Sequence, residues 1–410
     1  MEDNHSLTPI GYEEKTLSTL DVAALWAGIN ICLPSFMLGA ILVPALSWWQ
    51  ALAVTIIGNS IIFLLTYWMA LPGTDRGWSS VLMSRRVFGY PYGSLLPSLG
   101  IIASMIGWSA VMLSVTGLAV NDIVAKAFHY NNPTLFIIIT GLVITLTSLA
   151  GKKGINMASL IQVPALVILL GWILYILAVK FNLPGLVQFE PSGTVSLAKG
   201  FDWVIGGSIA GVFVASDLGR FARGRSEWGW GALWGIIPVN IGLAILGILS
   251  QLATGDWNPV KIIGTLDMGI PALLLLVFSA WTTNQVCLYS GGLAVFNILP
   301  RAHRLISTLV LGVLAILLAL SNYLEKLSTW LVQLSLMFGP MLGVALVYIA
   351  CRSYELPQVN RFEWGAILAL VAGIAAGKMS PDNWPVSIIS TLAAAVVYAG
   401  TRQILKALHQ

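Results

Sequence analysis

Apolar stretches of about 20 residues recur along almost the whole 410-residue chain, separated by short segments rich in glycine, proline or charge. This repetition constrains the fold more than any other feature, because one helix needs about 20 apolar residues to cross a bilayer. We therefore predict an all-α polytopic membrane protein with twelve transmembrane helices. The twelve predicted spans are residues 20–44, 50–71, 93–120, 133–151, 158–179, 201–219, 229–250, 269–296, 305–321, 327–350, 363–378 and 384–404.

The composition excludes a soluble fold. Hydrophobic residues make up 57% of the chain and charged residues only 9%, whereas about 25% of a typical soluble domain is charged. Because so few charges cannot cover a water-facing surface, membrane lipid is the expected surrounding. The net charge of +4 gives no indication of a nucleic-acid partner.

The charges between the spans predict the orientation. Of the 21 lysines and arginines, 15 fall on one side of the predicted membrane domain, and the six on the other side are all lysines. Cytoplasmic loops carry the excess of positive charge. We therefore expect a multi-pass protein of the plasma (inner) membrane with both termini in the cytoplasm. Residues 1–19 are then a cytoplasmic tail, because their polar, acidic start differs from a signal peptide.

Two predicted spans contain residues that weaken a helix near its middle. These are Gly28, Asn30, Pro34 and Ser35 in the first span and Gly206, Gly207, Ser208 and Gly211 in the sixth. The two spans lie five helices apart. This spacing fits a ten-helix transport core at 20–350 that is built as an inverted repeat of 20–179 and 201–350. In such a core the two interrupted helices meet at the midplane and hold a solute and a coupling ion. Residues 363–404 then add two further helices. The alternative is that the glycines only permit close helix packing.

The eighth span carries hydroxyl groups with the spacing of one helix face. Ser279, Thr282 and Thr283 stand at positions i, i+3 and i+4. Facing the interrupted first span, such neutral oxygens would suit a hard cation of low charge, and sodium is the natural occupant. The alternative is that these hydroxyls bond back to carbonyls of their own helix, as threonines in membranes commonly do.

Candidates for binding a flat polar solute lie in the third and eighth spans. Asn284 and Gln285 place two amides at bilayer depth, where polar groups usually face a cavity or another helix. Trp108 lies near the middle of its span, one helical turn after Ser104, whereas most other tryptophans lie near predicted membrane interfaces. Its ring could stack on a planar solute. Core packing is the alternative for Trp108.

The sequence gives no sign of catalysis. No histidine lies in a predicted span, and we find no Ser/His/Asp set, phosphate loop or pair of buried carboxylates. The three cysteines lie in apolar stretches without the spacing of metal ligands. We therefore expect a protein that is not an enzyme and needs no cofactor beyond a coupling sodium ion.

Five segments carry a resemblance to a known family. They are LSWWQALAVTIIGN at Leu46–Asn59, LPSLGIIASMIGW at Leu96–Trp108, VPA at Val163–Ala165, SDLGRF at Ser216–Phe221, and WTTN with LYSGGL between Trp281 and Leu293. With them the chain resembles the nucleobase:cation symporter family, and within it the bacterial cytosine permeases, over nearly its whole length. The resemblance implies a LeuT-like core of five plus five helices with two extra helices, usually coupled to sodium, that imports a nucleobase or a related heterocycle.

The resemblance also implies roles for single residues. The tryptophan that stacks on the base falls on Trp108, and the asparagine near the base falls on Asn284. The sodium ligands fall on the main-chain oxygens of Gly28 and Ile31 and on Ser279, Thr282 and Thr283.

Two positions depart from the cytosine permeases. Met105 stands where the resemblance implies a glutamine, and Ser208 stands where it implies an aromatic residue that closes the other side of the base. A thioether is only a weak acceptor and a serine leaves room. The ring could therefore be a purine, another pyrimidine, or a relative of allantoin or hydantoin.

The sequence as a whole predicts a secondary-active importer of a nucleobase, cytosine or a purine, or of a related heterocycle, coupled to sodium by alternating access. One alternative is an importer of an allantoin-like, hydantoin-like or other heterocycle with proton coupling. Another is a membrane sensor that does not transport. A channel is disfavoured because no rings of charge are present. The expected partners are the heterocycle and membrane lipid, while the identity of the ring, the ion stoichiometry and the oligomeric state stay open.

Overall fold

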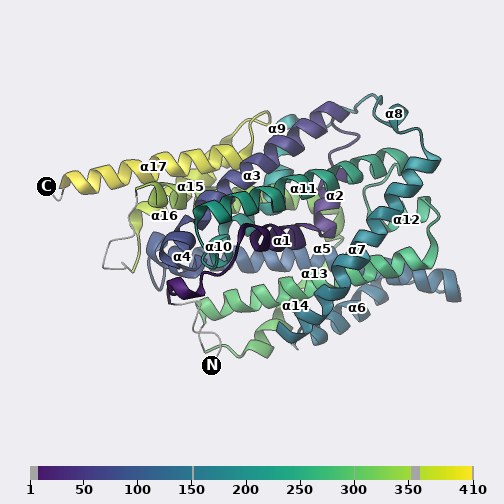
Figure 1. Ribbon diagram of the computed structural model, residues 1–410, viewed down its shortest axis with the longest axis horizontal. Helices are drawn as coiled ribbons and strands as arrows, with labels where there is room; N and C mark the ends of the chain where they lie inside the picture. Colours follow the sequence, from purple (N-terminus) through teal and green to yellow (C-terminus); the bar gives the residue numbers. More distant parts are fainter. Residues whose placement is uncertain (1–7, 150–151, 300, 352–360, 409–410) are drawn as a thin grey trace.

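The computed structural model describes residues 8–149, 152–299, 301–351 and 361–408, and these ranges form a bundle of helices without a β-sheet. Most of the long helices run along one common direction (Figure 1). The helices are η2 (Tyr12–Glu14), α1 (Thr19–Asn30), α2 (Leu33–Ala40), α3 (Trp48–Arg76), α4 (Ser80–Phe88), α5 (Leu95–Phe128), α6 (Pro133–Ser148), α7 (Lys152–Lys180), α8 (Leu183–Leu186), α9 (Leu197–Phe213), α10 (Ser216–Gly219), α11 (Arg225–Thr254), α12 (Pro259–Thr265), α13 (Gly269–Ile298), α14 (Arg304–Leu320), η3 (Tyr323–Lys326), α15 (Leu327–Ala350), α16 (Trp364–Met379) and α17 (Val386–Leu408).

A helix, or a pair of short helices, overlaps each of the twelve predicted spans. In the described part of the chain, six helices are long and apolar enough to cross a membrane, namely α3, α5, α7, α11, α13 and α15. The bent pair α1 and α2 makes a seventh, and α6 and α16 are shorter apolar helices, as is residues 305–320 of α14. The all-helical, multi-pass architecture is confirmed, while the number of twelve spans stays a prediction.

The first predicted span is broken where the sequence indicated. α1 ends at Asn30, α2 begins at Leu33, and the two helices meet at 61°. Cys32 between them has an extended backbone. Pro34 lies in the first turn of α2, where a backbone N–H has no partner within the helix, so the proline removes no helix hydrogen bond. The Cys32 N–H donates to Asn30 O at 2.8 Å, which releases the carbonyl of Gly28 from the i→i−4 ladder.

The sixth predicted span differs from the expectation. α9 continues unbroken through Gly206, Gly207, Ser208 and Gly211, and the interruption comes only after Phe213. The glycines serve close packing instead, because a Cβ at Gly206 would lie 2.0 Å from Leu331 O of α15, and one at Gly207 would lie 2.4 Å from the Leu38 side chain of α2. The expected interruption at Gly206–Gly211 was therefore wrong, and the packing alternative holds for these two glycines.

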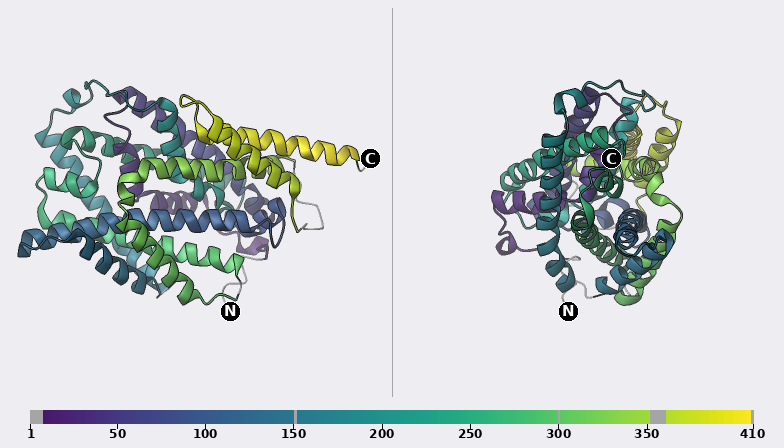
Figure 2. Two further views of the ribbon diagram at one scale, coloured as in Figure 1. Left: turned by 180° about the vertical axis from the view of Figure 1, so that it is seen from behind. Right: turned by 90° about the vertical axis from the view of Figure 1, so that its right-hand side faces the viewer.

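The helices form two groups that share the α1–α2 break between them. In the first group α11 packs against α1, α2 and α3, and α3 packs against α9; in the second group α5, α6, α13 and α14 pack together around a separate apolar core. α15 packs against α9 and, on its outer side, against α16 and α17. The short helices α4 and α10 lie at one end of the bundle and α8 and α12 at the other (Figures 1 and 2).

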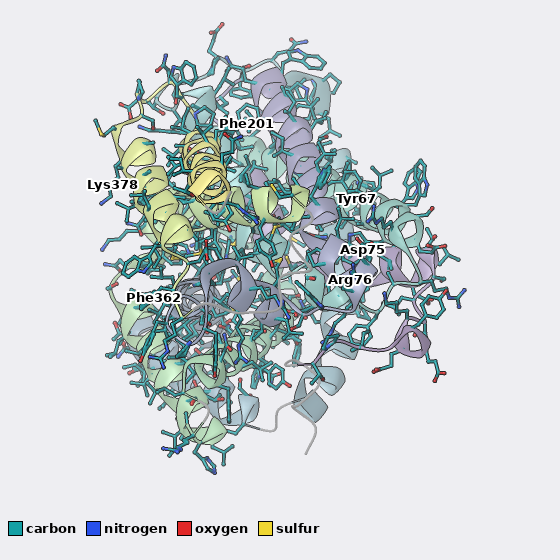
Figure 3. All side chains as sticks on the ribbon, turned by 90° about the vertical axis from the view of Figure 1, so that its left-hand side faces the viewer. Tyr67, Asp75, Arg76, Phe201, Phe362 and Lys378 are labelled. Atoms are coloured by element: carbon teal, nitrogen blue, oxygen red, sulfur yellow. The ribbon has the colours of Figure 1, made fainter. Side chains whose placement is uncertain are left out.

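The segment before α1 is bound to the end of the bundle that holds α4 and α10. Leu17 N–H donates to Phe221 O at 2.9 Å, and Arg223 N–H donates to Leu17 O at 3.1 Å. Nearby, Arg225 Nε donates to Asp75 Oδ1 at 2.6 Å, which joins α11 to the end of α3. Figure 3 looks at this end and shows Asp75 and Arg76 together at the end of α3. The C-terminal end of α17 lies toward the same end of the bundle (Figure 1).

The close contact of α2 with α11 gives a test of the packing. A Cβ at Gly247 would lie 2.1 Å from Phe36 O, whereas a Cβ at Gly242 on the same helix would meet nothing within 4 Å. We expect Gly247→Ala to lower the free energy of unfolding by about 1–3 kcal/mol, because backbone must shift to admit the methyl group. The melting temperature of the purified protein in detergent measures this.

Gly242→Ala is the matched control. It should be neutral or slightly stabilising, by up to about 1 kcal/mol, because alanine favours a helix over glycine. Equal melting temperatures for the two variants would contradict the contact between α2 and α11.

Candidate functional site

Trp108 lies midway along α5 and is buried, with 7% of its surface exposed. Gly107 before it lies against Trp330 of α15, since a Cβ at Gly107 would come within 2.3 Å of that ring. One turn earlier, Ser104 is fully buried, and its hydroxyl has no hydrogen-bond partner among the described residues. Ser104 and Trp108 stand four residues apart, so α5 carries an indole and an unpaired hydroxyl on one face.

Asn284 of α13 lies beside this part of α5. Its Oδ1 accepts a hydrogen bond from Ser109 Oγ at 2.9 Å, and its Nδ2 donates to Ala280 O at 3.1 Å. Both Asn284 and Ser109 are fully buried. An amide has a second N–H and a second lone pair. Asn284 can therefore keep both bonds and still contact a polar solute.

Met105 and Gln285 both have partners in neighbouring helices. The Cβ of Met105 lies 3.3 Å from where a Cβ at Gly291 would be, so Met105 packs against α13. Gln285 Nε2 donates to Thr147 Oγ1 of α6 at 3.2 Å, and Trp281 Nε1 donates to the same hydroxyl. Successive helix residues point about 100° apart, so Gln285 turns toward α6 while Asn284 turns toward α5.

The three hydroxyl residues of α13 are half or fully buried, and two of them bond to their own helix. Ser279 Oγ donates to Leu275 O at 2.9 Å, and Thr283 Oγ1 donates to Ser279 O at 3.3 Å. Thr283 Oγ1 also accepts from Gln162 Nε2 of α7 at 3.3 Å. Thr282 is 1% exposed. A hydroxyl that donates to a carbonyl keeps lone pairs for a cation, so back-bonding and ion binding are compatible here.

The break in the first span supplies main-chain oxygen. Gly28, near the end of α1, has open space where a Cβ would be, and its carbonyl is released from the helix ladder. Ile31 caps α1 and donates its N–H to Ala27 O. Cys32 in the break lies in the neighbourhood of Cys287 of α13.

Ser208 lines a small cavity of about 20 Å³ between α2, α3, α9 and α11. Ser35 Oγ of α2 donates to Asn240 Oδ1 of α11 at 3.3 Å, and Asn240 Nδ2 donates to Asn59 Oδ1 of α3 at 2.8 Å. Cys32 Sγ lies 3.3 Å from Ser35 Oγ. The cavity therefore begins one helical turn beyond the break, at Ser35.

The two acidic residues of the sixth span have structural partners. Asp202 Oδ1 and Oδ2 accept from Ser387 N and Val386 N, both at 2.8 Å, and so cap the start of α17. Asp217 accepts from Ser80 N and Ser80 Oγ at the start of α4. In the part of the chain that the structure describes, no cluster of three histidine, cysteine or acidic side chains could hold a metal ion.

Sequence reasoning missed three amides that belong to this region. Asn59, Asn240 and Gln162 are buried inside long helices, and each is hydrogen-bonded across to another helix. The rule that singled out Asn284, that amides at bilayer depth face a cavity or another helix, applies to all three. Asn59 even lies in a segment that carries the family resemblance.

Comparison with known proteins agrees with this architecture. Residues 9–399 match the family model described as a permease for cytosine/purines, uracil, thiamine and allantoin. The chain is 27% identical over 397 residues to the cytosine permease of Escherichia coli K12, covering 95% of this chain and 92% of that protein. It is 22% identical over 417 residues to the hydantoin permease of Microbacterium maritypicum, covering 92% of this chain and 85% of that protein.

Solved structures show the same fold. The inward-facing conformation of Mhp1 has a TM-score of 0.86 at 20% identity, covering 98% of this chain and 93% of that one. A closed conformation of Mhp1 with bromovinylhydantoin bound has a TM-score of 0.81 at 19% identity, covering 98% and 96%. Since the family model spans almost the whole chain, the resemblance drawn from the sequence is confirmed. This chain belongs to the nucleobase:cation symporter family, whose members are transporters and not enzymes.

Proposed function

We propose that this protein is a secondary-active importer that carries a nucleobase or a related heterocycle together with sodium. The observation that supports it most directly is the position of the α1–α2 break. Ser35, which is bonded to Asn240, lies one turn beyond the break, and Ser109 with Asn284 forms a second buried polar pair between α5 and α13. Free main-chain groups and polar side chains at membrane depth are what a transported polar solute requires.

The heterocycle is proposed to bind between α5, α13 and the break. Trp108 offers a ring for stacking, and Asn284 offers a donor and an acceptor in one plane. Ser104 adds an unpaired buried hydroxyl on the face of Trp108. Met105 and Ser208 border the site, while Gln285 is proposed to support α13 through Thr147 and not to contact the ring.

Sodium is proposed to bind between the end of α1 and α13. The main-chain oxygens of Gly28 and Ile31 and the oxygens of Ser279, Thr282 and Thr283 are all neutral. Such a set fits a hard monovalent cation. Proton coupling is less well supported, because the carboxylate of Asp202 is engaged with the start of α17.

The helix order supports the proposed inverted repeat of residues 20–179 and 201–350. In the first half the long helix α3 is followed by the short α4 and the long α5; in the second half α11 is followed by the short α12 and the long α13. α4 and α12 lie at opposite ends of the bundle (Figure 1), as inversion requires. On this scheme α16 and α17 are the two additional spans.

The orientation is proposed from charge. Arg85, Arg86, Arg220 and Arg223 lie on or next to α4 and α10, so this end of the bundle faces the cytoplasm under the positive-inside rule. η2 and the end of α17 lie at that end as well (Figure 1), so both termini are proposed to lie in the cytoplasm.

Sodium coupling gives the first functional test. Thr283→Val removes one proposed ligand oxygen and keeps the shape of the side chain. A polar contact to a charged group is worth about 1.5–3 kcal/mol, so the apparent affinity for sodium should fall roughly tenfold to one hundredfold. Uptake of radiolabelled nucleobases into proteoliposomes, at a series of sodium gradients, measures it.

Thr116→Val is the matched control, because Thr116 is also buried and back-bonded but lies in α5 away from the break. It should leave the sodium dependence unchanged. Uptake that ignores sodium and follows a pH gradient would contradict the proposal.

The stacking role of Trp108 gives the second test. Trp108→Ala should weaken binding of the heterocycle by about 1–3 kcal/mol, the range found where aromatic side chains stack on bases, and Trp108→Phe should retain part of it. Titration of the purified protein by intrinsic fluorescence or calorimetry measures the affinity. Trp228→Phe, at a fully buried tryptophan of α11, is the control. If the Trp108→Ala protein folds and binds the heterocycle as tightly as wild type, then Trp108 only packs against its neighbours and does not stack on the ring.

A further inference from the structure

The cavity beside Ser208 is small, lies between four helices and has several polar side chains in its wall. α2, α3, α9 and α11 all contribute to its wall, and its polar lining residues are Ser35, Thr55, Asn59, Ser208 and Asn240. Its volume is about 20 Å³, and about 10–15 Å³ suffices for one water molecule. The cavity therefore holds one group of the size of a water molecule.

The wall offers both hydrogen-bond donors and acceptors. Asn240 donates one N–H to Asn59 Oδ1, and Asn59 donates one N–H to Thr55 O at 2.9 Å. Each amide keeps a second N–H, and each amide oxygen keeps a second lone pair. An occupant that both donates and accepts hydrogen bonds is matched by these groups.

The hydroxyl of Thr55 is the clearest indication that a polar group binds in the cavity. It is fully buried, and its hydroxyl has no hydrogen-bond partner among the described residues. Thr116 and Thr145, equally deep in their helices, both donate to a carbonyl one turn earlier. A buried hydroxyl without a hydrogen-bond partner is unfavourable, and a polar group in the cavity would supply that partner.

The chemistry of the wall disfavours a cation. A cation accepts no hydrogen bond, so it would leave the Thr55 hydroxyl proton and the spare amide N–H groups unpaired. A neutral amino, hydroxyl or oxo group can form hydrogen bonds with these lining residues and therefore fits the cavity better than a cation does.

The cavity also lies next to the proposed heterocycle site. Ser35 Oγ is 3.3 Å from Cys32 Sγ at the α1–α2 break, and Ser208 lies on the face of α9 that meets α2. We propose that this cavity is a specificity subsite that receives one amino or oxo substituent of the transported ring. The inference rests on the proposed function, and it names the feature by which the protein separates one heterocycle from another.

A ring without that substituent leaves the buried polar groups unpaired, and sites of this kind discriminate strongly against such analogues. The test uses ring pairs that differ by one group: purine against adenine and hypoxanthine, and 2-hydroxypyrimidine against cytosine and uracil. Their dissociation constants are measured on purified protein by calorimetry. In at least one series we expect wild type to bind the substituted ring about tenfold or more tightly than its parent.

Thr55→Val should reduce that ratio to about threefold or less, mainly by weakening the substituted ring. Thr66→Val is the matched control, because Thr66 lies on the same helix, is 1% exposed, also lacks a partner for its hydroxyl, and does not line the cavity. It should leave the ratio unchanged. Ser208→Ala, at a half-buried position, gives a second variant if Thr55→Val does not fold.

The outcomes separate the two proposals. If rings bind but Thr55→Val and Ser208→Ala weaken parent and substituted rings equally, or change neither, the cavity is only a site for structural water and the inference falls while the proposed function stands. If no heterocycle binds to wild type, both fall. A ratio that drops in the cavity variants and not in Thr66→Val supports the subsite.

Discussion

The arrangement of this transporter depends on one requirement, that main-chain polar groups inside a membrane must find partners within the protein. Continuous helices meet this requirement along most of the chain. The helix is interrupted at residues 31–32, between α1 and α2. Such a break is tolerated only where protein or a polar cavity surrounds it. Ser35 of α2 and the amides of α3 and α11 form a chain of hydrogen bonds that begins one turn beyond this point, so polar side chains border the break.

Sequence reasoning located this break because Pro34 cannot continue the ladder of α1, whatever surrounds it. It failed for α9, where glycine only lowers helix stability and the neighbours decide. Gly206 and Gly207 lie against Leu331 and Leu38, and this packing keeps the helix continuous. The helix break near Pro34 could therefore be predicted from the sequence alone. The effect of the glycines in α9 could be judged only from their tertiary contacts.

The candidate site shows a similar limit. The helical architecture, the family and the burial of Trp108 and Asn284 within long helices could be predicted from apolar runs and motifs. The direction of each side chain could not, since Asn284 and Gln285 are adjacent in sequence and face different helices. Asn59 and Asn240 become a pair only when α3 packs against α11. A residue pair separated by 181 positions has no signature in a single sequence.

The two main-chain bonds of Leu17 have a mechanical consequence. They tie the segment that leads into α1 to the residues between α10 and α11 by main-chain hydrogen bonds. Such bonds are short and directional, so they transmit a displacement from one segment to the other. A shift of α1 at this end of the bundle therefore also displaces the start of α11, although the two helices are separated by about 200 residues in the sequence.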